Sequence, residues 1–172
     1  YSEKIVAVAC DYGAEVPFQR PANLSDHHTP TAPVIAHAVQ QMQNSGDDVK
    51  YACCIYPCTP LLTAECLDEI YQKMLDGDHM FSYPVVRYSH PIQRAMRMAS
   101  NGKMSLFQPE HELTRTQDLE PAYHDAGQFY WGKADAWLSG KKMHTDGIGV
   151  QISSRTVVDI DHIDDIERAE LI

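Results

Sequence analysis

The order of helical and strand-like segments predicts an α/β fold with a largely parallel sheet. Up to residue 87, segments with apolar residues at helical spacing alternate with short strand-like runs, and a further strand and helix follow near the C-terminus. The run Val49–Tyr56 is mostly apolar without polar alternation, as in a strand buried on both faces. In such folds helices cover the sheet and ligands bind beyond the carboxyl ends of the strands.

The first fifty residues are predicted to form two helices separated by a short strand and a loop. Apolar residues recur on one helical face of residues 2–12, and Gly13 ends that helix. Ala14–Phe18 is a strand candidate, and Arg20–Pro33 is a loop rich in Pro, Ser, Asp, His and Thr. Val34–Met42 again has helical spacing before an Asn-Ser-Gly stop.

The middle of the chain is predicted to continue the alternation. The strand Val49–Tyr56 ends in the doubly prolinated turn Pro57–Pro60. A helix capped by Thr63 then begins at about Ala64, and His79–Arg87 is a further strand. The loops after residues 18, 56 and 87 are therefore where functional side chains are expected.

The last half is predicted to be an irregular stretch followed by a return to the sheet. Residues 88–125 have little regular pattern beyond a strand at Lys103–Phe107. The remaining elements are expected to be strands at 128–131, 148–152 and 156–160, a short helix at 133–138 and a helix from about 163.

Composition excludes several classes of protein. The 172 residues include 24 Asp and Glu against 14 Lys and Arg, which gives a formal net charge of −10. Hydrophobic residues make up 44% of the chain, a composition typical of globular proteins. An acidic chain binds nucleic acid and anionic membranes poorly, so neither is an expected partner. No apolar run approaches the roughly 20 residues that span a bilayer.

The five cysteines indicate a reducing, cytoplasmic environment. Their count is odd and Cys53 and Cys54 are adjacent, which does not suit a disulfide framework. We interpret them as reduced, mostly buried thiols; a catalytic Cys58 is the alternative.

The strongest candidate for a metal site is the sequence Asp159-Ile160-Asp161. On a strand the two aspartates share a face, and a hard cation such as Mg²⁺ relieves their mutual repulsion. The alternative is that Asp161 caps the following helix, with Asp164 completing a capping box. The two roles are compatible.

Two further motifs are candidates for ligand binding, although each also has a purely structural interpretation. Tyr56–Leu62 forms a rigid turn after a buried strand, or is simply a strand-to-helix connection. Tyr123–Trp131 places aromatic, amide and acid groups around a glycine, which suits a sugar or an aromatic core strand. Glycine-rich phosphate loops and zinc spacings are absent from the sequence.

Together these motifs resemble cytidylyltransferases that activate nonulosonic acids, the acylneuraminate cytidylyltransferase family. The resemblance spans nearly all 172 residues in the right order, and the branch acting on pseudaminic acid matches especially well. It rests on the segments Tyr12–Thr29, Tyr56–Leu62, Tyr88–Ala95, Arg115–Leu119, Ala122–Trp131 and Asp159–Asp161.

The resemblance implies a three-layer, Rossmann-like nucleotidyltransferase domain that transfers CMP from CTP to the anomeric hydroxyl of a nine-carbon α-keto sugar acid. It implies a homodimer, with an excursion at about 84–125 reaching the neighbouring subunit's site. By position, Asp159 and Asp161 match the Mg²⁺ pair. The nucleotide side is matched by Arg20, Pro57 and Thr59, and the sugar side by Tyr56, His90, Gln93, Arg94, Gln128 and Tyr130. We expect Arg94, among Arg20, Arg94 and Arg115, to bind the sugar carboxylate as a bidentate fork and count it with the two aspartates as catalytic.

One family feature is missing from the sequence. The family opens with a strand and a glycine- and lysine-rich phosphate loop, and Tyr1 aligns after the second strand. We therefore expect one N-terminally incomplete domain over 1–172, with much of the triphosphate-binding part lacking. The alternatives are a non-catalytic remnant that binds sugar or dimerises, and the same reaction on neuraminate, legionaminate or 3-deoxy-manno-octulosonate. The intact mass of the purified protein, or the reading frame upstream of Tyr1, distinguishes the non-catalytic remnant from the synthase.

Overall fold

The computed structural model describes residues 2–26, 28–158, 160 and 162–172 and contains both helices and strands. The α-helices are α1 (Glu3–Asp11), α2 (Thr31–Asn44), α3 (Ala64–Asp76), α4 (Ala134–Leu138), α5 (Met143–Asp146) and α6 (Ile163–Glu170). The strands are β1 (Tyr51–Ile55), β2 (Phe81–Arg87), β3 (Met96–Met98), β4 (Met104–Leu106), β5 (Tyr123–Asp125), β6 (Phe129–Lys133) and β7 (Gly147–Gln151). Short 3₁₀ turns lie at Ala22–Leu24 (η1), Ile92–Arg94 (η2), Pro109–His111 (η3), Thr116–Asp118 (η4) and Ser154–Thr156 (η5).

The chain forms two compact units, each assembled from three separate stretches. The first unit contains the residues up to Cys54 together with Tyr71–Ser82 and Tyr130–Ile148. The second contains Ile55–Ile70, Tyr83–Phe129 and Gly149–Ile172. Strand β2 begins in the first unit and continues in the second.

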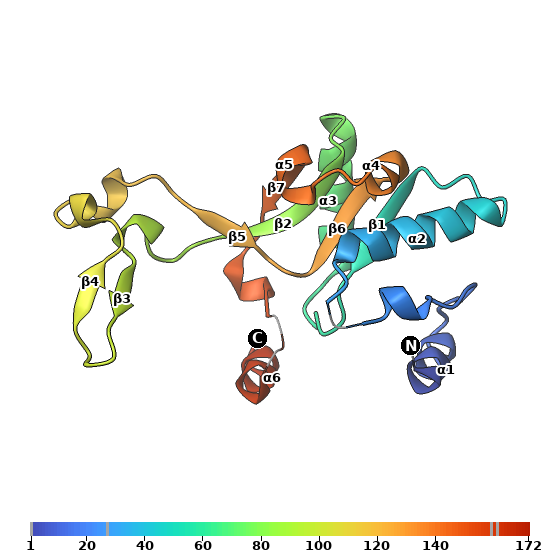
Figure 1. Cartoon of the computed structure of the whole chain (residues 1–172), viewed down its shortest axis with the longest axis horizontal. Helices are drawn as coiled ribbons and strands as arrows, with labels where there is room; N and C mark the ends of the chain where they lie inside the picture. The colour runs from blue at the N-terminus through green and yellow to red at the C-terminus, as the bar shows by residue number, and fades with distance from the viewer. Residues whose placement is uncertain (1, 27, 159, 161) are drawn as a thin grey trace. The chain divides into compact units, whose positions relative to one another are not determined.

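The core of the first unit is built on Trp137. Its ring packs edge-on against Phe81, with centroids 4.9 Å apart, and its indole N–H donates to the carbonyl of Ala52 at 3.3 Å. A side chain at Gly132 would meet both rings within 2.7 Å, so only glycine permits this close approach. Helix α2 packs against α4 on the same unit (Figure 1).

The second unit contains the continuation of β2, its neighbour β5, the larger part of β7, helix α6 and a long excursion between β2 and β5. Residues 88–122 form the excursion, because the amide of Tyr88 donates to the carbonyl of Ala122 at 2.9 Å and closes its base. Within it β3 and β4 pair as a hairpin, Met96 opposite Leu106 and Met98 opposite Met104 (Figure 1).

The predicted mostly parallel sheet is wrong. Strands follow the order β1-β6-β2-β5, with β7 also paired with β2, and β2 is antiparallel to both β5 and β6. The physical reason is the excursion: a strand that returns without a helical crossover comes back antiparallel. The apolar run of β1 predicted a strand buried on both faces, and this is also wrong: its first four residues are half-buried and Ile55 is 51% exposed.

The α/β class and most predicted elements are confirmed. Helices α1, α2, α3, α4 and α6 and strands β1, β2, β4, β6 and β7 lie within a few residues of their predicted positions. The cap of α3 is also as expected, because the amide of Cys66 donates to Thr63 Oγ1 at 3.3 Å.

Two predicted strands are wrong. Residues 14–18 form no strand, Thr156 belongs to a 3₁₀ turn, and residues 157, 158 and 160 are in no strand. Strands β3 and β5 and helix α5 are too short, three or four residues each, to show a period in the sequence.

No helix among the described residues is long and apolar enough to cross a membrane.

Candidate functional site

A hollow of about 600 Å³ lies in the second unit where β2 gives way to the excursion. We call it the exit hollow. It is lined by Val86, Arg87, Tyr88, Ser89, His90, Pro91, Thr116, Leu119, Glu120, Pro121, Ala122, His124, Ser154 and Arg168. The loop after Arg87 is one of the places where the sequence predicted functional groups, and residues 88–91 of that loop line the hollow.

The register of β2 on β5 builds one wall of the exit hollow. Val86 lies opposite His124, and Arg87 opposite Tyr123. Side chains alternate along a strand, so Val86 and Tyr88 share the face on which His124 lies. The rings of Tyr88 and His124 meet with centroids 4.9 Å apart and planes inclined at 59°.

The hydrogen bonding of His124 fixes its tautomer. Its Nδ1 lies 2.8 Å from the carbonyl oxygen of Asp125. A carbonyl can only accept, so Nδ1 carries the proton and Nε2 of the neutral ring is an acceptor. The wall therefore combines an aromatic platform with a defined polar group.

The charges in the exit hollow favour an anion. Two arginines, Arg87 and Arg168, line it against one acid, Glu120, and His90 and His124 add ring nitrogens that can form hydrogen bonds. Exposed cations with a partly enclosed wall attract carboxylate and phosphate groups. The volume is in the range of a small-molecule site.

A second hollow of about 330 Å³ adjoins the first. We call it the side hollow. It shares Val86, His124, Ser154 and Arg168 with the exit hollow and adds Asp125, Ala126, Gly127 and Val157. Asp125 shapes this wall because its Oδ1 accepts from the amide of Gly127 at 2.8 Å.

The turn after β1 holds three of the predicted residues together. Thr59 Oγ1 donates to the carbonyl of Tyr56 at 3.1 Å, and the amide of Tyr56 donates to the carbonyl of Gln128 at 2.9 Å. Pro57 is exposed in the same turn, and Cys58 has φ 64, in the left-handed region. Exposed Pro57 and half-buried Thr59 leave this turn accessible to a ligand.

Gln128 and Tyr130 are buried rather than open. Gln128 is 2% exposed, and its Nε2 donates to the carbonyl of Thr156 at 3.0 Å. Tyr130 is 5% exposed and lies edge-on to His144 with centroids 6.4 Å apart. Both side chains have structural contacts that account for their burial.

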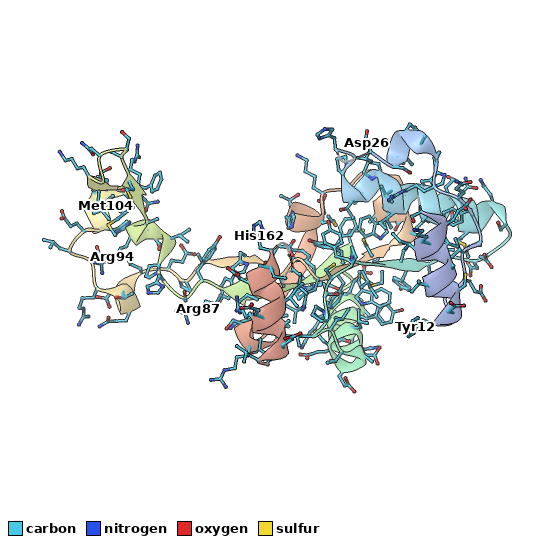
Figure 2. The ribbon with its side chains drawn as sticks, turned by 90° about the horizontal axis from the view of Figure 1, so that it is seen from below. Tyr12, Asp26, Arg87, Arg94, Met104 and His162 are labelled. Carbon is cyan, nitrogen blue, oxygen red and sulfur yellow. The ribbon has the colours of Figure 1, made fainter. Side chains whose placement is uncertain are left out.

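The structure separates Arg94 from His90. His90 lines the exit hollow, with Nδ1 3.0 Å from Ser89 Oγ, whereas Arg94 lines a different hollow on the β3–β4 hairpin, beside Met104 and Glu112. Figure 2 shows Arg87 where the chain leaves β2 and Arg94 with Met104 further out in the excursion. Gln93 lies between them in the chain and donates through Nε2 to the carbonyl of Glu120 at 3.0 Å.

The other two arginines have local partners. Arg20 is exposed and donates through Nε to Ser25 Oγ at 3.2 Å. Arg115 makes a bidentate pair with Asp118, at 2.8 and 3.2 Å. The guanidinium of Arg115 is therefore already occupied by a carboxylate.

The predicted metal pair, Asp159 and Asp161, lies outside the described residues. Among the residues that are described, no group of three or more His, Cys, Asp and Glu is arranged to hold a metal ion. The N-cap of α6 is His162, whose amide donates to Asp165 Oδ2 at 2.8 Å. The capping box is thus one residue later than the Asp161–Asp164 alternative.

Sequence reasoning missed Arg87, His124 and Arg168 as site residues. His124 lies in the motif Tyr123–Trp131, but its partner in the hollow is Tyr88, the residue that directly follows the adjacent strand β2. Arg168 follows Arg87 by 81 residues in the chain. A local sequence motif cannot indicate that residues so far apart line the same hollow. The only signal in the sequence was the expectation that functional groups gather where the strands end.

The fold is that of a nucleotidyltransferase of the CMP-sugar synthetase type. A solved structure of a CMP:2-keto-3-deoxy-manno-octonic acid synthetase in complex with CTP superposes with a TM-score of 0.63, covering 99% of this chain and 77% of that one. The two are 11% identical in sequence, so the likeness concerns the fold alone.

Sequence comparison identifies the family. The chain is 36% identical over 171 residues to the pseudaminic acid cytidylyltransferase of Campylobacter jejuni subsp. jejuni serotype O:2, covering 99% of this chain and 74% of that protein. It is 34% identical, with the same coverage, to the enzyme of the same name from serotype O:23/36. No family model matches. The chain belongs to the pseudaminic acid cytidylyltransferase family.

Proposed function

We propose that the protein transfers CMP from CTP to the anomeric hydroxyl of pseudaminic acid, forming the CMP-sugar and pyrophosphate. The observation that supports this most directly is the 36% identity, over 99% of the chain, to an enzyme named for that activity. The solved CTP complex of similar fold supports CTP as the nucleotide.

The exit hollow supports the sugar-acid side of the reaction. Bringing a sugar acid to a nucleoside triphosphate joins two anions, so the site must neutralise charge and align the attacking oxygen. Arg87, Arg168, His90 and His124 provide cationic and hydrogen-bonding groups, and Tyr88 provides an apolar face. We assign the sugar acid to this hollow.

The residues predicted by resemblance remain proposals for binding. On the nucleotide side these are Arg20, Pro57 and Thr59. On the sugar side they are Tyr56, His90, Gln93, Arg94, Gln128 and Tyr130. Of these only His90 lines the exit hollow, so it has the most direct structural support.

Mg²⁺ is proposed as the metal, held by Asp159 and Asp161. Two carboxylates supply the oxygen ligands that Mg²⁺ prefers, and the ion would neutralise phosphate charge when bound. Asp159→Asn should weaken Mn²⁺ binding, measured by calorimetry with Mn²⁺ as the probe, and should remove metal-dependent turnover. Asp164→Asn, an exposed acid in the first turn of α6, is the matched control. Unchanged Mn²⁺ affinity in the Asp159 variant would remove that residue from the metal site.

A homodimer through the excursion is also proposed. Six large apolar side chains are exposed on residues 88–122 apart from Tyr88, namely Ile92, Met96, Met98, Met104, Phe107 and Leu113. Such a patch is typical of a protein interface. Met98→Asp should convert a dimer to monomer in sedimentation velocity, whereas Tyr12→Asp, at the exposed C-cap of α1, should not. A dimer that survives Met98→Asp contradicts this interface.

Pyrophosphate release tests the proposed reaction. The whole natural polypeptide containing residues 1–172 is incubated with CTP and Mg²⁺, and sugar acids are added one at a time. Release with pseudaminic acid, and much less with neuraminate, legionaminate or 3-deoxy-manno-octulosonate, is the expected result. Absence of release with every acid, in protein that binds CTP, would favour the non-catalytic alternative. Preferential release with another acid would change the substrate.

A further inference from the structure

The exit hollow and the side hollow meet at four residues, Val86, His124, Ser154 and Arg168. The exit hollow holds the aromatic and histidine groups suited to a sugar. The side hollow extends to Val157, which precedes Asp159 by two residues. Of the two hollows, the side hollow is therefore the one whose lining comes nearest to the proposed metal pair in the sequence.

The chemistry of the substrate links the position of its carboxylate to that of its attacking hydroxyl. In an α-keto sugar acid, the carbon that bears the attacking hydroxyl also bears the carboxylate. A sugar bound in the exit hollow with its hydroxyl directed into the side hollow therefore holds its carboxylate where the two hollows meet. The group that recognises the carboxylate must line both.

Arg168 is the only one of the four shared residues with a permanent positive charge. Its guanidinium forms no ion pair or hydrogen bond with any residue in the described part of the chain, and it is exposed. Ser154 adds a hydroxyl, and His124 adds a ring with a fixed tautomer. An arginine fork matches a carboxylate in a bidentate manner.

The other arginines considered do not meet this requirement. Arg87 lines the exit hollow only, Arg94 lines a separate hollow, and Arg115 is paired with Asp118. The lining of the hollows therefore favours Arg168 over Arg94 as the residue that binds the carboxylate.

We infer that Arg168 binds the carboxylate of the sugar acid, with Ser154 and His124 beside it. This rests on the proposed function. It makes Arg168 a residue that distinguishes sugar acids from neutral sugars of the same shape.

The test compares pseudaminic acid with its neutral carboxamide, in titration calorimetry with the whole natural polypeptide and CTP present. Arg168→Gln should weaken binding of the acid about 10- to 150-fold, the range for a hydrogen bond to a charged group. The same variant should change carboxamide binding less than about threefold. Arg168→Lys should lie between, because it keeps the charge and loses the fork. Arg155→Gln, a neighbouring arginine that lines neither hollow, is the control.

Two results would overturn the inference without affecting the proposed function. One is wild-type affinity for the acid in Arg168→Gln; the other is an equal loss for acid and carboxamide, with an unchanged melting temperature. If the unaltered protein binds CTP but neither sugar, the proposed function itself fails and the inference with it. The two failures are distinguishable, because the first is seen in the Arg168→Gln variant and the second in the unaltered protein.

Discussion

The ring of Tyr88 meets the imidazole of His124 across the β2–β5 pair, with centroids 4.9 Å apart. Tyr88 lies two residues beyond Val86, the register partner of His124, so the antiparallel pairing itself brings the rings together. The contact joins the start of the excursion to its return. It gives the exit hollow a wall that does not depend on the hairpin further out.

Tyr88→Ala should weaken binding of the sugar acid about 2- to 10-fold, because an aromatic contact contributes about 0.5–1.5 kcal/mol. Tyr88→Phe keeps the ring and should bind nearly as the unaltered protein does. Titration calorimetry measures both. Tyr12→Ala, at a tyrosine that is 90% exposed on the other unit, is the control. Equal affinity of the Tyr88→Ala and unaltered proteins would show that this wall does not touch the ligand.

Trp137→Ala should lower the free energy of unfolding by about 3–5 kcal/mol, the usual cost of deleting a large buried ring. Trp137 is 1% exposed, packs on Phe81 and donates to Ala52. Urea denaturation measures the loss. Leu113→Ala, at a side chain that is 94% exposed, should change stability by less than about 0.5 kcal/mol. A loss below 1 kcal/mol for Trp137→Ala would mean that the first unit has another core.

The helices could be predicted from the sequence because their signals are local. Periodicity and the Thr63 cap fix α3, and Gly13, with φ 89, ends the stretch that forms α1. The direction of the sheet could not be predicted in the same way. It depends on how residues 88–122 return, and that is decided by the pairing of Val85–Arg87 with Tyr123–Asp125.

The site could be predicted only in part for the same reason. The loop after Arg87 follows from the rule that ligands bind where strands end, and His90 lines the hollow found there. His124 and Arg168 reach the same hollow from the returning strand and from the last helix. Their positions depend on tertiary structure, which no spacing of residues in the sequence reports.

The thiols should differ sharply in reactivity. Burial raises the pKa of Cys53 to about 12, with the neighbouring Cys54 thiol adding to the shift, and burial raises the pKa of Cys54 to about 11. Only the thiolate reacts, so at pH 8 both should be alkylated more than about 100-fold more slowly than an ordinary exposed thiol. Cys10 and Cys58 are exposed and should be labelled first.

Peptide mapping by mass spectrometry after brief iodoacetamide treatment measures this order. Urea-unfolded protein, in which all five cysteines should react alike, is the control. Comparable labelling of Cys53 and Cys58 in the folded protein would contradict the raised pKa of the Cys53 thiol.

Asp78 and Lys133 form an ion pair in the first unit, between the turn after α3 and the end of β6. The hydrogen bond and charge of Lys133 lower the pKa of Asp78, and the hydrogen bond to Asp78 raises the pKa of Lys133. A carboxyl with a lowered pKa stabilises the fold above its unfolded pKa and loses that contribution as the pH falls through the folded value. An amine with a raised pKa stabilises the fold below its unfolded pKa and loses that contribution as the pH rises through the folded value.

The pair should therefore stabilise the fold between about pH 4 and pH 10. Asp78→Asn should be less stable than the unaltered protein at pH 7, and the difference should shrink toward zero at pH 3. Asparagine tolerates the left-handed backbone of Asp78, with φ 51, so the variant removes the charge without adding strain. Urea denaturation at the two pH values measures the difference. Asp48→Asn is the control. The lysine of its ion pair, Lys50, is 72% exposed, whereas Lys133 is only 19% exposed, so water screens the control pair more strongly. A difference for Asp78→Asn that persists unchanged at pH 3 would mean that the carboxylate is not what stabilises this turn.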